Sequence, residues 1–313
     1  MAAAAMFAGC SGGGSSALAP VPISPASIRH FASHYSCPAT GSLKYVSDAR
    51  LNVIFVYAGK FSGQSPCGLI ASASLMIPTG LHVQAATHDL YVANEYGEDI
   101  VVFHRGQIEA YNTYTDPSVQ LPIDVTVAPD GTVLASNYTN RAQSEKGSIS
   151  TWIAGPNGGT FVGNYPETNS YQGAYIAVRK NGTVYFDDVD RNNLQGFVWK
   201  VSCPAGACGV QTQVAGVVLQ FPGGIAFDKT GDMLVTDVFA ATADTFELPN
   251  PAPSTFAMAG EPWDMAISTG DRSIFTFNSF RNEALEYSYP GGTLIGTVTG
   301  ASGGAIGGIA VDP

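Results

Sequence analysis

The chain has 313 residues, and its 25 Asp and Glu residues against 14 Lys and Arg residues give it a net charge of −11. This acidic balance argues against a nucleic-acid-binding protein, because a phosphate backbone requires a basic protein surface. The chain also carries 36 glycines and 19 prolines, and amphipathic helical periodicity is absent. Composition and pattern together indicate an all-β protein that is rich in turns.

The first 36 residues are predicted to be a signal remnant followed by a flexible tether. Residues 6–10 read Met-Phe-Ala-Gly-Cys and precede a run of Ser and Gly. This segment resembles a bacterial lipoprotein cleavage site, which implies lipidation of Cys10 and export to the cell envelope. The alternative is a disordered tail rich in Ala and Gly. A lipid anchor would be the only membrane attachment, since no other stretch approaches the roughly 20 apolar residues of a membrane span.

A unit of two short strands recurs along the rest of the chain. Its clearest copy is residues 222–237, with strands predicted at 225–227 and 233–236 and a turn at 229–232. The copies follow one another at intervals of roughly 40–50 residues, which is the length of a propeller blade with four short strands. They begin at Pro78, Pro122, Gly173, Pro222, Pro262 and Ile306.

The last copy has no second strand, and the N-terminal part of the chain supplies the missing half. Residues 44–48 and 52–57 match residues 90–94 and 99–103 without a gap. Such complementary ends are expected of a circular array and not of an open solenoid. We therefore predict a six-bladed β-propeller in a single domain, residues 37–313. The C-terminal strand, about 306–312, would close it by pairing with N-terminal strands at about 43–73.

Four cysteines remain if Cys10 is lipidated, and they form two natural pairs. Cys203 and Cys208 lie between the predicted third and fourth strands of one blade, where a hairpin brings its two ends together. Cys37 and Cys67 flank the N-terminal strands and would staple the closing blade. Two disulfides, Cys203–Cys208 and Cys37–Cys67, indicate an oxidising compartment. The spacings lack the paired C-x₂-C units of structural zinc sites.

The second strand of every repeat ends in an acid or an amide. In one interpretation each side chain accepts a hydrogen bond from the backbone of the following turn. In the other, the six side chains are oxygen ligands for a hard cation such as Ca²⁺. We favour the structural interpretation, because a device repeated in every blade most simply serves the blade. These rim residues are Asp48, Asn94, Asn137, Asp188, Asp237 and Asn278.

The innermost strands line the central channel, and the residue two positions after each repeat start defines a ring of six positions. Asp124 and Asp264 belong to blades three apart, so we expect them to face each other across the axis, with Tyr175 and Trp263 at the same channel mouth. Two such carboxylates would hold a metal or act as acid and base; alternatively, each caps the loop of its own strand. His82 is a further catalytic candidate or a packed core residue. The ring residues are Gly80, Asp124, Tyr175, Gly224, Asp264 and Gly308.

Residues 221–228 (Phe-Pro-Gly-Gly-Ile-Ala-Phe-Asp) and 306–313 (Ile-Gly-Gly-Ile-Ala-Val-Asp-Pro) carry a family resemblance. They resemble NHL-repeat and SMP-30-like (gluconolactonase-like) six-bladed propellers, and the resemblance covers residues 43–313. It implies the architecture, while such blades serve hydrolases, lyases and binding scaffolds alike. SMP-30-like lactonases bind a divalent metal through Glu, Asn and Asp, typically with Asn directly before the ring glycine. Positions 79, 123, 174, 223, 263 and 307 hold neither Asn nor Asp, so that metal site does not carry over.

These observations predict an exported, lipid-anchored, monomeric propeller that acts as a non-catalytic binding or scaffolding module at the cell envelope. Its partner would be a small molecule, a glycan or an envelope protein, bound at the channel. The alternative is a divergent metal-dependent hydrolase of the lactonase type that uses Asp124, Asp264 and rim acids around Ca²⁺. Propeller lyases similar to streptogramin lyase rely on catalytic histidines, and His82 is the one innermost-strand histidine available for that role.

Overall fold

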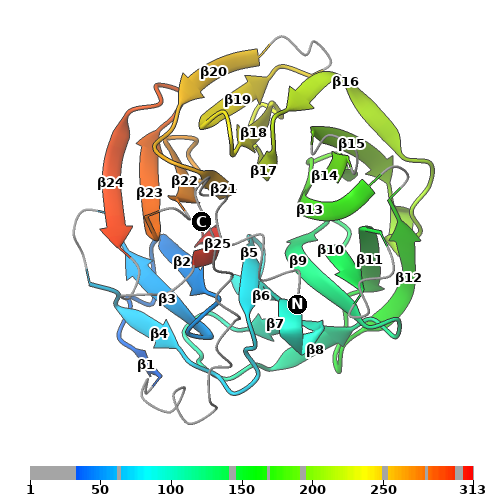
Figure 1. Ribbon diagram of the computed structural model, residues 1–313. Helices are drawn as coiled ribbons and strands as arrows, with labels where there is room; N and C mark the ends of the chain where they lie inside the picture. Colours follow the sequence, from blue (N-terminus) through cyan, green and yellow to red (C-terminus); the bar gives the residue numbers. More distant parts are fainter. Residues whose placement is uncertain are drawn as a thin grey trace, which may run out of the picture.

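Six antiparallel sheets are arranged around a central axis in the computed structural model (Figure 1). The structure describes residues 33–61, 65–140, 146–167, 170–190, 195–248, 253–278, 281–299 and 306–312. Within these ranges the only helical segments are two short 3₁₀ turns, Glu95–Gly97 and Pro204–Gly206, and no helix is long and apolar enough to cross a membrane. The predicted six-bladed β-propeller is confirmed.

Blades 2 to 6 each contain four strands that follow the chain from the channel outward. Blade 2 contains β5 (Pro78–Gln84), β6 (Asp89–Asn94), β7 (Asp99–Phe103) and β8 (Asn112–Thr115). Blade 3 contains β9 (Gln120–Val127), β10 (Thr132–Asn140), β11 (Ser148–Ile153) and β12 (Thr160–Pro166). Blade 4 contains β13 (Ser170–Val178), β14 (Thr183–Asp190), β15 (Gly196–Ser202) and β16 (Thr212–Leu219). Blade 5 contains β17 (Pro222–Phe227), β18 (Met233–Asp237), β19 (Thr242–Phe246) and β20 (Pro253–Ala257). Blade 6 contains β21 (Pro262–Ile267), β22 (Ser273–Asn278), β23 (Glu283–Ser288) and β24 (Leu294–Thr299).

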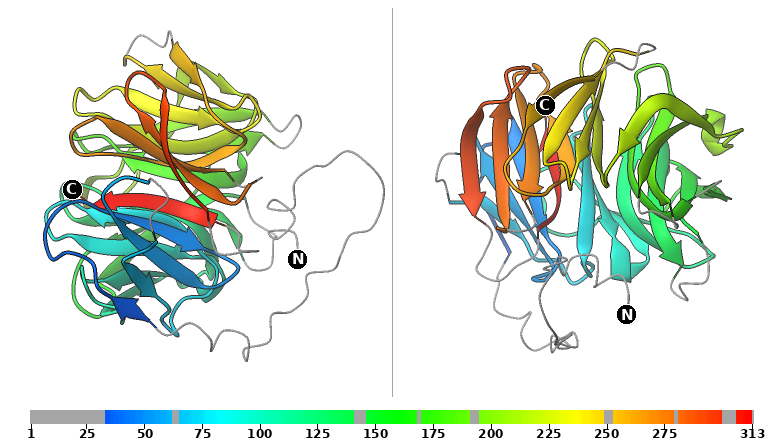
Figure 2. Two further views of the ribbon diagram at one scale, coloured as in Figure 1. Left: turned by 90° about the vertical axis from the view of Figure 1, so that its left-hand side faces the viewer. Right: turned by 45° about the horizontal axis from the view of Figure 1, so that its top comes forward.

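Blade 1 closes the ring by joining the two ends of the chain. Its strand order is β25, β2, β3, β4, β1, with β2 (Leu43–Asp48), β3 (Val53–Ala58), β4 (Gly68–Ile70) and β25 (Ile306–Asp312). β25 pairs with β2 in antiparallel register from Leu43 opposite Asp312 to Asp48 opposite Ile306. Figure 2 shows β25 as the red strand beside the blue strands of this blade. The predicted closure by the C-terminal strand is therefore confirmed.

One predicted boundary differs from the structure. β1 (His34–Tyr35) pairs with β4, so ordered structure begins inside the segment that we predicted to be tether up to residue 36. β1 hydrogen-bonds to the outer edge of the short strand β4. A strand of two residues leaves no pattern in the sequence from which this pairing could be predicted. In blade 5, β19 begins at Thr242, because the turn after Asp237 is tight and Asp237 pairs directly with Thr242.

The hydrophobic core is divided into wedges between neighbouring blades. One cluster joins blades 1 and 2 through side chains such as Leu43, Ile54, Leu81 and Val92. Similar clusters join blades 2 and 3, blades 3 and 4, and blades 5 and 6, and the largest cluster includes residues of blades 1, 4, 5 and 6. Each sheet is consequently buried on both faces, which explains why both alternating sets of residues in its inner strands are apolar.

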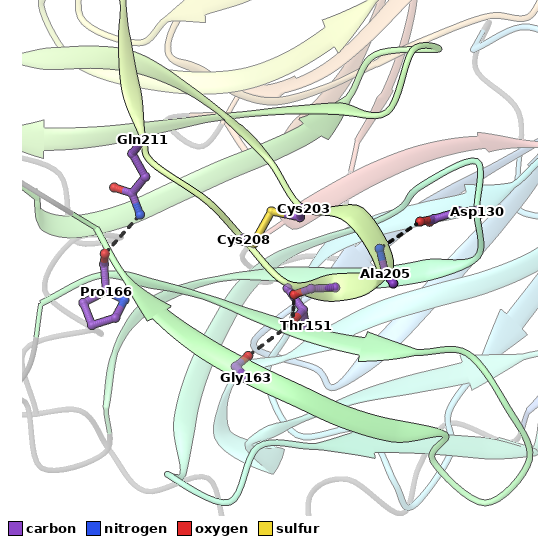
Figure 3. Close-up of a disulfide and its surroundings, with 9 residues drawn as sticks. Asp130, Thr151, Gly163, Pro166, Cys203, Ala205, Cys208 and Gln211 are labelled. Atoms are coloured by element: carbon purple, nitrogen blue, oxygen red, sulfur yellow. Dashed lines mark hydrogen bonds between the residues drawn. A yellow bond between two sulfur atoms is a disulfide. The ribbon is translucent and has the colours of Figure 1, made fainter.

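Both predicted disulfides are present. Cys37–Cys67 links the segment after β1 to the residue before β4, and so ties the outer edge of the closing blade. Cys203–Cys208 closes the turn between β15 and β16 (Figure 3). This turn packs on blade 3, where Thr151 Oγ1 donates a hydrogen bond of 2.7 Å to the Gly206 carbonyl. The second disulfide thus braces a contact between blades as well as its own hairpin.

Replacing Cys37 and Cys67 by serine is expected to destabilise the fold more than the same change at Cys203 and Cys208. The two bridges close segments with sequence separations of 30 and 5. The loop-entropy model assigns about 4 kcal/mol to the longer loop and about 2 kcal/mol to the shorter one. Urea unfolding of the two double variants tests the order, and a larger loss in the Cys203/Cys208 variant would contradict it.

Candidate functional site

The innermost strands of the six blades surround a cavity of about 400 Å³ on the propeller axis. This volume lies within the range of small-molecule sites in proteins. Its walls come from β5, β9, β13, β17, β21 and β25. The exposed residues Ala85, Lys180 and Lys229 lie just beyond the ends of these strands and mark the open end of the cavity.

The cavity exists because small residues recur on the innermost strands. Three ring residues are glycines at which the neighbouring backbone leaves no room for a side chain. A Cβ on Gly308 would lie 2.3 Å from the Thr79 carbonyl oxygen and 2.8 Å from the Gly80 Cα atom. Two residues further along each strand, five blades carry Ala or Thr and the sixth carries a histidine. These six residues all line the cavity: His82, Thr126, Ala177, Ala226, Ala266 and Ala310.

Asp124 and Asp264 both line the cavity, on β9 and β21, which lie on opposite sides of the axis (Figure 1). Their exposed fractions are 5% and 4%, so they form its floor and not the mouth that we predicted. The close approach of the ring glycines narrows the channel at this level and buries them.

Each carboxylate joins its own strand to the next blade. Asp124 accepts hydrogen bonds from the backbone N–H groups of Val125 (2.8 Å) and Ile176 (2.9 Å). Asp264 accepts from Met265 (2.7 Å) and from Ile309 (2.9 Å), so it connects blade 6 to the C-terminal strand of blade 1. Neither carboxylate therefore serves only the loop of its own strand.

The protonation of this pair is governed by burial. Desolvation raises the pKa of Asp264 to about 7, although its two backbone hydrogen bonds oppose the shift. Desolvation also raises the pKa of Asp124, and the nearby Asp264 carboxylate raises it further. Two buried carboxyl groups that repel each other hold a proton near neutral pH, which is the arrangement found where a site performs acid–base chemistry or binds a cation.

His82 lies on the cavity wall and is partly exposed to it. Burial lowers its pKa to about 4, because the charged imidazolium would lose its hydration. The side chain is neutral at physiological pH and offers the cavity one donor and one acceptor.

Tyr175 and Trp263 do not lie at a channel mouth, and this prediction was wrong. Both belong to the largest core cluster, with exposed fractions of 4% and 8%. The Trp263 ring packs edge-on against Phe221, with 5.5 Å between ring centroids. The backbone N–H of Tyr175 donates to Asp187 Oδ1 at 2.7 Å. Trp263 alternates with Asp264 along β21, so its side chain turns into the wedge between blades. Burial raises the pKa of Tyr175, and the charges of the nearby Asp264 and Asp124 raise it further.

The rim residues bind loops in several ways. Asp48 accepts from the backbone of Arg50 and Leu51 in the turn that follows it, as the structural interpretation expects. Asp237 accepts from Ala240 in its following turn and also from Gln220 and Phe221, which precede β17.

The other rim side chains reach different groups. Asn94 and Asn278 accept from the Met76 and Glu261 N–H groups, in the loops that precede β5 and β21. Asn137 donates to the hydroxyls of Ser148 and Ser150 on β11. Burial raises the pKa of Asp188 to about 6. Asp48, Asn94, Asp237 and Asn278 thus bind backbone groups of the loops next to their own strands, and these four rim residues anchor blade geometry.

A metal site is not evident among the residues that the structure describes, where no group of three His, Cys, Asp or Glu side chains is arranged to hold an ion. Calcium binding stays a prediction from the sequence. Cys10 lies outside the described residues. Sequence reasoning missed the polar residues of the open end, Lys180, Lys229 and Asp271, because they follow the innermost strands in turns that look like ordinary surface loops.

Comparison with known proteins identifies relatives of the fold. No model of a known family matches the chain, and no curated protein matches it. Among solved structures, a chain of the nidogen/laminin complex has a TM-score of 0.66 at 14% identity, covering 87% of this chain and 99% of that one. A Bacteroides caccae protein of unknown function has a TM-score of 0.60 at 13% identity, with coverages of 87% and 99%. Streptogramin B lyase has a TM-score of 0.51 at 11% identity, with coverages of 83% and 74%. At these identities the likeness shows the propeller fold alone.

Proposed function

We propose that this protein is an exported propeller that acts as a non-catalytic binding or scaffolding module, with the axial cavity as its ligand site. The two disulfides support an oxidising compartment outside the cytoplasm. Lipidation of Cys10 would hold the propeller at the cell envelope. The nidogen/laminin complex, in which a similar fold occurs in an assembly of two proteins, is compatible with such a role.

The observation that carries the proposal is how the floor carboxylates are used. All four oxygens of Asp124 and Asp264 accept backbone hydrogen bonds, and one bond to each carboxylate, from Ile176 and Ile309, joins neighbouring blades. The walls above them include partly exposed apolar side chains such as Val178, Phe227 and Ile267. A hollow with apolar walls and a few polar groups at its base is typical of a ligand pocket.

Native mass spectrometry of the purified protein tests this site. We expect a bound small molecule to be retained by the wild type and lost from Ala266→Phe, which fills the cavity from its wall. Val210→Ala is the matched control, because Val210 is 90% exposed and lies outside the cavity. Equal retention by Ala266→Phe with an unchanged melting temperature would refute the cavity as the ligand site.

The hydrolase alternative rests on the place of Asp264 at the cavity floor, where burial raises its pKa to about 7, a value that suits a general acid or base at neutral pH. A screen of lactones and esters distinguishes the two functions. Turnover that Asp264→Asn abolishes, without loss of the fold, would support the hydrolase and contradict the non-catalytic role.

A further inference from the structure

The charged groups that line the axial cavity are not balanced along its length. At the open end, Lys229 Nζ lies 3.7 Å from Asp271 Oδ2, and Lys180 Nζ donates to the Lys229 carbonyl at 3.2 Å. Asp228 accepts hydrogen bonds from Thr230 and from the Tyr289 hydroxyl. Two lysines and two aspartates therefore cancel at this end, and a ligand that enters meets no net charge there.

The floor carries negative groups without a cationic partner. Among the residues that the structure describes, every hydrogen bond to Asp124 or Asp264 comes from a backbone N–H, and no Lys, Arg or His forms an ion pair with either carboxylate. Each carboxylate oxygen uses one acceptor site for its backbone N–H and keeps a second site for another donor. A buried carboxylate is stable only when it is paired or protonated.

The walls between floor and opening suit an apolar body. They include the partly exposed apolar residues Val178, Phe227, Ala266, Ile267 and Val311. A hydrated metal ion would leave these surfaces uncovered, whereas an organic ligand would bury them. His82 contributes a neutral hydrogen-bonding group on one side.

We infer that the cavity takes a small organic cation, a primary amine on a compact apolar body, whose ammonium group binds between Asp124 and Asp264. This inference rests on the proposed binding function and specifies its ligand. An ammonium group has three N–H donors and forms charge-assisted hydrogen bonds to carboxylates. It would therefore fill free acceptor sites on both Asp124 and Asp264. The apolar body would then occupy the space between the walls.

The same geometry couples binding to proton release. The empty floor retains a proton at neutral pH because the pKa of Asp264 is raised to about 7. An ammonium ion would replace that proton, so affinity should rise with pH through about 7 and level off above it. The other titratable groups around the floor are Tyr175 and Asp187, whose pKa values are also raised by burial, and His82, which is neutral throughout this range.

Titration calorimetry of the full chain with phenethylamine, and with 2-phenylethanol as its uncharged counterpart, tests the inference. We expect the amine to bind about tenfold more tightly at pH 8 than at pH 6, since a pKa near 7 leaves only about a tenth of the floor deprotonated at pH 6. In buffers of different ionisation enthalpy the heats should show protons released on binding. Asp264→Asn and Asp124→Asn should each weaken binding at least tenfold, whereas Asp130→Asn, outside the cavity, should not.

Several results would overturn the inference. These are absence of amine binding, equal affinity for the alcohol, or amine affinity unchanged in both floor variants with their folds intact. If the alcohol binds in the wild type but not in Ala266→Phe, the cavity remains a ligand site and only the cationic ligand is rejected. If neither probe binds and native mass spectra show no ligand sensitive to Ala266→Phe, the proposed binding function fails as well.

Discussion

A chain that ends at residue 305 is expected to lose its cooperative thermal unfolding transition. This truncation removes β25, whose Ile309 and Ala310 are almost fully buried and which pairs along the whole length of β2. It also removes Asp312, which forms a hydrogen bond with His88 (2.6 Å) and an ion pair with Arg105. The loss of two buried side chains, a strand ladder and the Asp264–Ile309 hydrogen bond exceeds about 5 kcal/mol, which is comparable to the stability of a whole domain.

Near-ultraviolet circular dichroism and thermal melts measure this effect, and a chain ending at Asp312 is the matched control. Adding a synthetic peptide of residues 303–313 to the truncated chain should restore part of the transition, because the open edge of β2 accepts a strand in trans. A truncated chain that melts like the wild type would show that the ring does not depend on β25 for closure.

Mild acid is expected to stabilise the protein, in contrast to the behaviour of most acidic proteins. Burial raises the pKa of Asp264 and of Glu95 to about 7 and that of Asp188 to about 6, whereas these carboxyls titrate near 4 when unfolded. The folded state therefore binds more protons than the unfolded state between about pH 4 and pH 7. Its stability is highest near the lower limit and falls as the pH rises through the folded pKa values.

His82 opposes this trend, because its pKa is lowered to about 4 in the folded state. The unfolded state takes up its proton as the pH falls through about 6.5, so His82 removes stability between about pH 6.5 and pH 4. The three carboxyl groups together change the stability more than the single imidazole does. We expect the free energy of unfolding to be on the order of 2–4 kcal/mol higher at pH 5 than at pH 8, with a melting temperature several degrees higher.

Thermal melts across pH 5 to 8 test the sign, with Asp264→Asn as the diagnostic variant. Asparagine does not titrate, so the pH dependence should become shallower. The same variant should be less stable than the wild type at pH 5 and closer to it at pH 8. Asp130→Asn, in a turn on blade 3, should leave the pH profile unchanged. A melting temperature that rises steadily toward pH 8 would contradict the prediction.

The architecture was readable from the sequence because each blade repeats a local pattern. Strand periodicity, turn residues such as Gly231 with φ of 88°, and the matching halves at the two ends depend on neighbours in the chain. The disulfide Cys203–Cys208 was predictable for the same reason, because its two cysteines lie close together in the chain. Counting blades also placed Asp124 and Asp264 on opposite sides of the axis, where the structure shows them.

The tertiary structure decided which way side chains turn and what they contact. Tyr175 occupies the same repeat position as Asp124 and Asp264, yet it packs into the core while the two aspartates reach the cavity. A repeat pattern gives the position of a residue along its strand but not the distance to the neighbouring blade. That distance is set by Gly80, Gly224 and Gly308, where neighbouring strands approach closely, and it determines whether Asp264 bonds to Ile309 across the closing interface. The blades follow from short-range order, and the cavity floor follows from packing between residues far apart in the chain.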